Sequence, residues 1–296
     1  MPPNGPHLQR DKSKSKSKSR ERKGECFLCS RPSSTKCPSC ELVHFCCNDH
    51  LLAHRQQNYC FPFRVRWRSG KGRCLVATRD IKALELIMFD AAIAHGPQNM
   101  TVPLCLECGK SVDGSYLCGM CNMPMCDAAC QVGSTHYNEC QILRTLKEKL
   151  SVKNFQDKES PIYQCITPLR LLMKKNTHPK WFRRLTFLMD HREAREQEET
   201  MWNDHQKNIV DFLLKSCNLN FSREDVMWAV GILKTNSIMF GETNGRALFP
   251  MFSLINHSCA ANAKHTLYIK NRWKSKSFEN KVFKFNSLTS TGFQSL

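Results

Sequence analysis

Two kinds of apolar pattern run along this chain, and each predicts a different kind of element. Three short runs rich in Val, Ile, Leu and Phe (63–67, 73–81 and 84–94) predict β-strands, with Ser69-Gly70-Lys71-Gly72 as the loop between the first two. From 141 to about 239, apolar residues recur at three- to four-residue spacing, which predicts helices. The chain is therefore expected to mix α and β structure.

Helix boundaries in the second region are marked by proline and by capping residues. Pro161 and Pro168 are expected near the starts of helical segments, because proline fits the first turn of a helix. Residues 191–215 predict one long surface helix. Ser222, followed by Arg-Glu-Asp, is expected to be the N-cap of the next helix.

The charge of the chain is strongly positive, with 44 Lys and Arg against 26 Asp and Glu, a formal net charge of +18. Such an excess favours polyanions or acidic protein surfaces, but it says nothing about the fold. Residues 1–25 hold part of this charge in a Lys/Ser/Arg-rich, apolar-poor stretch that is expected to be disordered. Its alternating Lys-Ser pattern also fits a nuclear localisation or nucleic-acid patch, although import signals usually have contiguous basic residues.

The 18 cysteines point to either disulfides or metal sites. The N-terminus has no apolar stretch of the kind found in a secretory signal, and no apolar run approaches the roughly 18 residues of a membrane span. The chain is therefore expected to stay in a reducing compartment and to have no membrane partner. Thiols remain available for metal there, so zinc is favoured over disulfides.

One cysteine-rich block lies between residues 105 and 140. It contains two Cys-x2-Cys pairs and two pairs at i, i+4 spacing, which suit a knuckle and a helical turn respectively. Eight donors make two tetrahedral zinc sites, but spacing alone leaves open whether the pairs combine in sequence or interleave. The donors are Cys105, Cys108, Cys118, Cys121, Cys126, Cys130, His136 and Cys140.

A related but irregular copy of this block lies between residues 26 and 60. Cys47 and His44 are spare donors near it, and its second site can also be read as a half-site of poor affinity. The isolated Cys74, Cys165 and Cys217 are expected to be small core residues. The donors of the copy are Cys26, Cys29, Cys37, Cys40, Cys46, His50, His54 and Cys60.

The spacing of the 105–140 block resembles a MYND zinc finger, in which the first and third pairs share one ion and the second and fourth share the other. The resemblance implies one zinc on Cys105, Cys108, Cys126 and Cys130, and another on Cys118, Cys121, His136 and Cys140. By the same interleaving, the 26–60 block would hold one zinc on Cys26, Cys29, Cys46 and His50, and another on Cys37, Cys40, His54 and Cys60.

Two segments on either side of the finger resemble the halves of a SET domain, the fold of most protein-lysine methyltransferases. Residues 70–81, beginning Gly-Lys-Gly-Arg-Cys, are similar to its opening loop and strand. Residues 245–250 lead into 253–259, which end in the Asn-His-Ser-Cys signature, and Asn262 follows at the usual place although Ala261 replaces a proline. A SET domain interrupted by a MYND finger is the SET-and-MYND (SMYD-like) arrangement, and an additional N-terminal finger resembles the arthropod branch.

The expected fold is α+β: a split SET-type β-assembly interrupted by a MYND finger, with an α-helical insert and a second small zinc module. The expected organisation, from N- to C-terminus, is a disordered basic tail (1–25), a MYND-like finger (26–60), the SET N-terminal part (61–104), the MYND finger (105–140), the helical insert (141–235), an incomplete SET C-terminal part (236–266) and a divergent basic tail (267–296).

The resemblance also implies a pocket for S-adenosylmethionine. A glycine-bearing loop lets the backbone approach a cofactor closely, a basic side chain pairs with its carboxylate, and asparagine supplies donors and acceptors. Cys74 stands where the family usually has a second glycine. The cofactor residues implied are Lys71, Arg73, Ser253, Asn256 and His257.

No catalytic residue is assigned. The family continues past this signature to a catalytic-site tyrosine and three zinc-binding cysteines, whereas this chain has no cysteine after Cys259. Tyr268, the only tyrosine there, falls in the strand before the expected turn. We therefore expect a C-terminally truncated or alternatively ended product.

Three functions compete on this basis. The first is an S-adenosylmethionine-dependent methyltransferase acting on lysines of histones or other regulatory proteins, in transcriptional or chromatin regulation. The second is a non-catalytic adaptor whose MYND fingers bind short peptides of regulatory partners. Nucleic-acid binding is the weakest, since it rests on charge alone. Nucleus and cytoplasm both fit.

Overall fold

The computed structural model divides the chain into two compact units, Met1–Phe61 and Pro62–Leu296. Each unit is considered by itself. The structure describes residues 24–26, 29, 31–38, 43–56, 60–70, 72–98, 102–146, 161–177, 179, 182, 185–186, 188–240, 245–269 and 281–287. The N-terminal residues expected to be a disordered tail lie almost entirely outside these ranges.

The first unit is small and has little apolar interior. Strand β1 (Gly24–Glu25) pairs antiparallel with β2 (Pro32–Ser33), and one helix, α1 (Asn48–Gln56), follows. Its buried apolar cluster, among the described residues, consists of Cys26, Cys37 and Phe45 with partly buried neighbours around them. A core of this size cannot offset the entropy of ordering the chain by itself.

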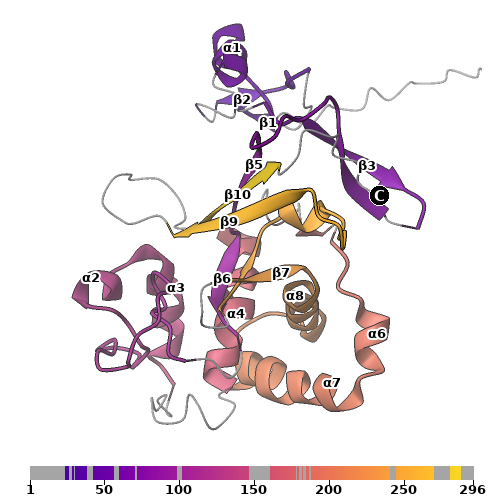
Figure 1. The fold of residues 1–296 in the computed structure, drawn as a ribbon. Helices are drawn as coiled ribbons and strands as arrows, with labels where there is room; N and C mark the ends of the chain where they lie inside the picture. The colour runs from indigo at the N-terminus through magenta and orange to yellow at the C-terminus, as the bar shows by residue number, and fades with distance from the viewer. Residues whose placement is uncertain are drawn as a thin grey trace, which may run out of the picture. The chain divides into compact units, whose positions relative to one another are not determined.

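The second unit contains eight described strands in three small sheets (Figure 1). Strands β3 and β4 form a hairpin around a tight turn in which Gly70 and Gly72 have φ of 73° and 71°. The other two sheets have the strand orders β6-β8-β7 and β5-β10-β9, all antiparallel. The bounds are β3 Phe63–Arg68, β4 Gly72–Ala77, β5 Leu86–Ala91, β6 Ala94–Pro97, β7 Ser237–Phe240, β8 Gly245–Leu248, β9 Ala263–Ile269 and β10 Lys281–Ser287.

Helices occupy the middle of this unit and carry most of its core. Figure 1 shows α4 beside β6 and α8 beside β7, and α4 also packs against η2 and α8. No helix in the described part of the chain is both long and apolar enough to cross a bilayer. The helical segments are α2 Ala128–Gln131, α3 Ser134–Leu143, α4 Pro161–Thr177, α6 Arg192–Glu196, α7 Glu199–His205, the π-helix η2 Gln206–Ser216, α8 Arg223–Asn236 and the 3₁₀ turn η3 Phe252–Leu254.

One apolar cluster extends through this unit from the 105–140 finger to the helices. It includes finger cysteines such as Cys118 and Cys140 together with Leu169 of α4 and Leu233 of α8. The cysteines expected in the core, Cys74, Cys165 and Cys217, are all buried. Helix α3 crosses residue 140, where the boundary between finger and helical insert was expected.

The strands and the cap of α8 are confirmed. The three β-rich runs form β3 to β6, and Ser222 Oγ accepts a hydrogen bond from Asp225 N at 3.0 Å at the start of α8. The position expected for Pro168 is wrong, since this residue lies inside α4 rather than near the start of a helix. Packing overrides its helix-breaking tendency there, because Ile166 and Leu169 are fully buried on either side of it.

The long helix expected at 191–215 is confirmed in part: α7 runs directly into the π-helix η2 from Glu199 to Ser216, but the helix is interrupted between α6 and α7. Arg195 of α6 is buried, and its guanidinium donates to Asp190 O at 2.7 Å and to Met227 O on α8 at 3.2 Å, so it holds α6 against α8.

Within the segment expected as a divergent basic tail (267–296), Lys281–Ser287 form β10, which pairs with both β5 and β9. Its β5 partner is far away in sequence, so no local pattern shows the pairing.

Candidate metal centres and cofactor site

The 105–140 block, called the second finger from here on, contains two Cys-x2-Cys pairs that form two similar turns. Gly109 N donates to Cys105 O at 2.7 Å, and Asn122 N donates to Cys118 O at 2.8 Å. Gly109 and Asn122 follow the second cysteine of each pair and have φ of 71° and 64°. Glycine and asparagine are the residues that adopt this left-handed conformation most readily. Each turn therefore places its two sulfurs on the same side.

The two remaining pairs are placed by short helices. Asp127 caps α2, and its Oδ1 accepts a hydrogen bond from Cys130 N at 2.8 Å. His136 and Cys140 lie one turn apart on α3, so both side chains face the same way. Both residues are buried.

The eight donors of the second finger meet in two groups, and the pairs interleave. Within each group the donor atoms all lie within 4.8 Å of one another. The groups are Cys105, Cys108, Cys126 and Cys130, and Cys118, Cys121, His136 and Cys140.

The spacing of these donors fits a tetrahedral metal. The Cys118 and Cys140 sulfurs are 3.7 Å apart, and Cys121 Sγ lies 3.5 Å from His136 Nε2. Tetrahedral zinc with Zn–S bonds of about 2.3 Å holds two sulfurs ~3.8 Å apart. Thiolate and imidazole are the donors that structural zinc prefers, so both groups can hold zinc.

The pKa values of the thiols also favour metal binding. A hydrogen bond from Cys108 lowers the pKa of the Cys105 thiol to about 4, whereas burial, with the nearby charge of Cys105, raises the pKa of Cys130 to about 12. One thiolate thus disfavours the next when no cation is present. A divalent cation removes this repulsion and allows all four sulfurs to act as ligands.

In the first unit, one complete group of donors and one partial group come together. Cys29 Sγ lies 3.4 Å from Cys46 Sγ, and His50 faces this group through Nδ1. The complete group is Cys26, Cys29, Cys46 and His50, and the partial one is Cys37, His54 and Cys60. Cys40, expected as the fourth donor of the partial group, lies outside the described residues. Neither Cys47 nor His44 belongs to a group found among the described residues.

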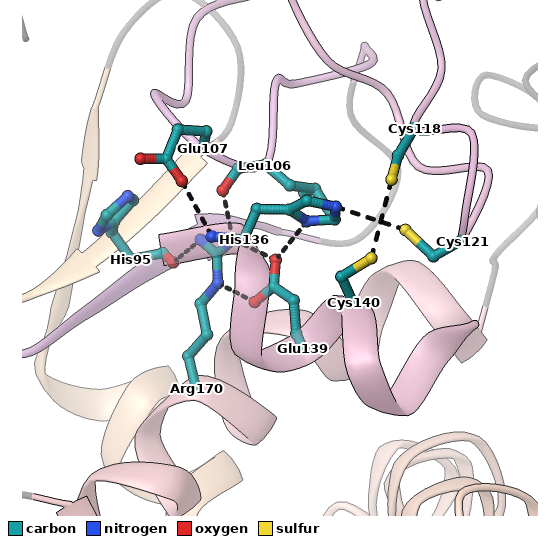
Figure 2. Close-up of polar contacts among 9 residues, drawn as sticks. All are labelled: His95, Leu106, Glu107, Cys118, Cys121, His136, Glu139, Cys140 and Arg170. Atoms are coloured by element: carbon teal, nitrogen blue, oxygen red, sulfur yellow. Dashed lines mark hydrogen bonds and ion pairs between the residues drawn. The ribbon is translucent and has the colours of Figure 1, made fainter. Parts of the chain in front are cut away.

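Behind the His136 group lies a set of buried polar residues that the sequence did not reveal (Figure 2). Glu139 Oε1 is 3.4 Å from His136 Nδ1, and Arg170 donates to both oxygens of the Glu139 carboxylate. Glu107 Oε2 accepts a hydrogen bond from His136 N at 2.9 Å. One signal was present in the sequence: Arg170 interrupts an otherwise apolar stretch of leucines.

The expected cofactor residues come from two distant segments that the fold brings into contact, since β4 packs against η3. Arg73 on β4 is half-buried, and burial lowers its pKa. Asn256 follows η3, and its Nδ2 atom is buried with no hydrogen-bond partner in the described part of the chain. Lys71 lies outside the described residues.

The other two expected cofactor residues are already engaged or exposed. The Ser253 hydroxyl contacts Phe249 O at 2.8 Å and Asn236 O at 3.1 Å, so it holds the turn in place. His257 is exposed, with Nε2 3.3 Å from Cys259 Sγ. Asp90 on β5 was missed by the sequence analysis: its Oδ2 accepts hydrogen bonds from Met251 N and Phe252 N and fixes the start of η3.

Comparison with known proteins gives two curated relatives, both from Drosophila melanogaster. SET domain-containing protein SmydA-8, isoform A, is 29% identical over 213 residues, which cover 66% of this chain and 42% of the relative. Isoform B is 26% identical over 222 residues, which cover 69% of this chain and 46% of the relative. The chain therefore spans less than half the length of the relatives it matches. No family model matches the sequence.

Two of the solved structures that the comparison found are from LSMT proteins. The SET domain of LSMT bound to lysine and AdoHcy gives a TM-score of 0.42 at 13% identity, covering 81% of this chain and 49% of that one. Rubisco LSMT bound to AdoMet gives a TM-score of 0.37 at 13% identity, covering 81% and 48%. The sequence matches to the Drosophila proteins confirm the resemblance to SMYD-like SET-domain proteins.

Proposed function

We propose that this chain is a zinc-binding protein of the SET-and-MYND type, related to S-adenosylmethionine-dependent protein-lysine methyltransferases and acting in transcriptional or chromatin regulation. The observation that carries the proposal is the convergence of four thiol or imidazole donors at each of three places. The proposed location is the nucleus, the cytoplasm or both. The proposed substrate class is lysine in a histone or another regulatory protein.

Zinc has a structural role in this proposal. Each group supplies four protein donors and leaves no open position for water or substrate, which is the arrangement of structural rather than catalytic zinc. Bound zinc would supply folding free energy to segments that have little regular structure of their own. In the second finger it would hold α3 against the two cysteine turns.

The proposed S-adenosylmethionine site is formed by the β4–η3 contact. Asn256 supports it, because a buried amide nitrogen without a partner costs free energy unless a ligand accepts its hydrogen bond. Arg73 would pair with the cofactor carboxylate, and Gly70 and Gly72, which have no side chains, would allow its close approach. When bound, the cofactor would supply an electrophilic methyl group for transfer to an amine. Ser253 would maintain the turn that carries Asn256.

Calorimetry with S-adenosylmethionine tests this site on the zinc-loaded chain. We expect a dissociation constant on the order of micromolar, weakened at least ~10-fold by Asn256→Ala, which corresponds to one lost hydrogen bond. Asn203→Ala, at an exposed position of α7, is the matched control and should leave binding unchanged. Absence of binding to folded, zinc-loaded protein would exclude the cofactor site and leave the adaptor function.

The adaptor function has one observation in its favour. The second finger exposes Val132 and Tyr137, which are 74% and 58% solvent-accessible. Exposed apolar and aromatic side chains are found at protein–protein interfaces. An array of short proline-containing peptides would test it. Binding should be lost on Tyr137→Ala and retained on Met189→Ala, which removes an equally exposed apolar side chain outside the finger.

A further inference from the structure

Arg170 of α4 joins three segments that are far apart in the sequence (Figure 2). Its Nε and Nη2 atoms donate to the two carboxylate oxygens of Glu139 on α3. Its Nη1 atom donates to His95 O on β6 at 2.7 Å, and Nη2 also donates to Leu106 O in the first cysteine turn. The guanidinium thus contacts the finger, the helical region and a sheet at one point.

All of these charges are removed from solvent. Arg170 is 7% exposed and Glu139 is 1% exposed. A two-point contact between a guanidinium and a carboxylate fixes the orientation of both groups, and burial strengthens it. The Glu139 carboxylate therefore has one defined position.

That position faces the ring of His136. Glu139 Oε1 lies 3.4 Å from His136 Nδ1, while His136 Nε2 points at Cys121 Sγ, 3.5 Å away. A histidine that binds metal through one ring nitrogen usually donates the proton on the other to a carboxylate, and this contact sets the ring orientation.

The backbone of His136 is held as well. Glu107, between the two cysteines of the first turn, accepts a hydrogen bond from His136 N. Its carboxylate occupies the space beside Gly133, where an added Cβ would lie 2.2 Å from Oε2. Both the ring and the main chain of His136 are thus held in place by carboxylates, and His136 in turn belongs to the group with Cys118, Cys121 and Cys140.

We propose that Glu139 and Arg170 are positioning residues for the zinc at Cys118, Cys121, His136 and Cys140, and that they make this zinc site depend on α4 and β6. The inference rests on the zinc binding proposed above. It adds that the two sites of the finger differ: the group with four cysteines does not contact Arg170 or Glu139 through any of its donor atoms in the described contacts. Loss of the Glu139 carboxylate should therefore affect one site selectively, whereas Arg170 also donates to Leu106 O, next to Cys105 of the other site.

Site-resolved thiol labelling under a graded chelator challenge tests the proposal on the full zinc-loaded chain. Cysteines released from zinc react with an alkylating reagent, and mass spectrometry identifies which ones have reacted. The variants are Glu139→Gln and Arg170→Met, with Glu139→Gln/Arg170→Met as a form that leaves no unpaired buried charge and is therefore the most able to fold. Glu196→Gln, which breaks the exposed 2.7 Å pair with Arg192, is the matched control.

We expect the chelator concentration for half-labelling of Cys118, Cys121 and Cys140 to fall about 10- to 100-fold in all three variants, the usual effect of losing such an outer contact. In Glu139→Gln the Cys105, Cys108, Cys126 and Cys130 set should shift less than ~3-fold, as should every cysteine in Glu196→Gln. In the two variants without Arg170 this set also loses the contact at Leu106 O, so its shift should be larger but still smaller than that of Cys118, Cys121 and Cys140. Equal shifts in both sets, accompanied by labelling of core Cys165, would show general unfolding and overturn the proposal. Unchanged labelling of Cys118, Cys121 and Cys140 in the variants would also overturn the proposal. If wild-type cysteines label fully without chelator, the zinc proposal itself fails.

Discussion

The two cysteine-rich modules, residues 26–60 and 105–140, have the same kinds of potential metal donor but differ in what surrounds them. In the second finger, the group of Cys118, Cys121, His136 and Cys140 is fully buried, the other group is partly buried, and both belong to or pack against a cluster that continues into α4 and α8. In the first unit, Cys29 is exposed and Cys46 and His50 are half-buried, and the described core is limited to Cys26, Cys37 and Phe45 with their neighbours. The difference lies in packing rather than in ligand chemistry.

The local sequence explains part of this contrast. The second finger has Gly109 and Asn122 after its two cysteine pairs, and both adopt positive φ. The first module has Ser30 and Glu41 at the equivalent positions, residue types that adopt this conformation less readily. The second finger also has the Asp127 cap and the Glu139 contact. The donors of the second finger therefore pack in a large apolar core, whereas those of the first module have few apolar neighbours. Only the first module is expected to depend on metal for its whole fold.

Metal removal should separate the two modules most strongly. We expect residues 24–61 to lose nearly all protection from hydrogen exchange in the apo chain, because structural zinc supplies about 10–16 kcal/mol and the local core is small. Helices α4 and α8 should retain most of their protection through their own apolar packing. Hydrogen-exchange mass spectrometry of the full chain, with zinc added back as the control, measures both regions together. Equal loss in both would remove the distinction drawn here.

A smaller effect is expected from Gly133→Ala in the second finger. The new Cβ would lie 1.9 Å from the Glu107 carboxylate carbon, so the carboxylate must move away from His136 N. Displacing this buried contact should cost about 1–3 kcal/mol in the unfolding free energy of the second unit. Chemical denaturation followed by the far-UV signal measures the change.

Gly119→Ala is the control for this prediction, because nothing lies within 4 Å of the position where its Cβ would be. It should change stability by less than ~0.5 kcal/mol. Equal effects of the two substitutions would mean that Glu107 does not support α3.

The smallest effect is expected at Asn122. Alanine there must adopt φ near 64°, which costs about 1 kcal/mol, whereas glycine adopts it freely. Asn122→Ala should therefore lower the unfolding free energy by about this amount, and Asn122→Gly should change it little. A destabilisation by glycine as large as that by alanine would show that the asparagine side chain, and not the backbone angle, matters in this turn.

Much of the donor arrangement was predictable because the cysteine and histidine donors occur in pairs with short, regular spacing in the sequence. Spacing identified the donors, and the resemblance to MYND fingers gave the interleaved combination in which they meet. The strands β3 to β6 and the cap at Ser222 were also predictable, since each depends on residues close in sequence.

The features that the sequence did not reveal depend on contacts between distant segments. Strand β10 pairs with β5, and Arg170 meets Glu139, His95 and Leu106, none of which is a sequence neighbour. The interior position of Pro168 follows from tertiary packing that overrides local preference. A charged residue in an apolar helix signals that a partner exists, but it does not identify the partner.

Native mass spectrometry of the purified full chain tests the central claim most directly, because it counts bound zinc. Three complete donor groups predict at least three zinc ions per chain, and a fourth if Cys40 completes the group of Cys37, His54 and Cys60. Two zinc ions or fewer would contradict the account, since at least one complete set of four donors would then not hold metal.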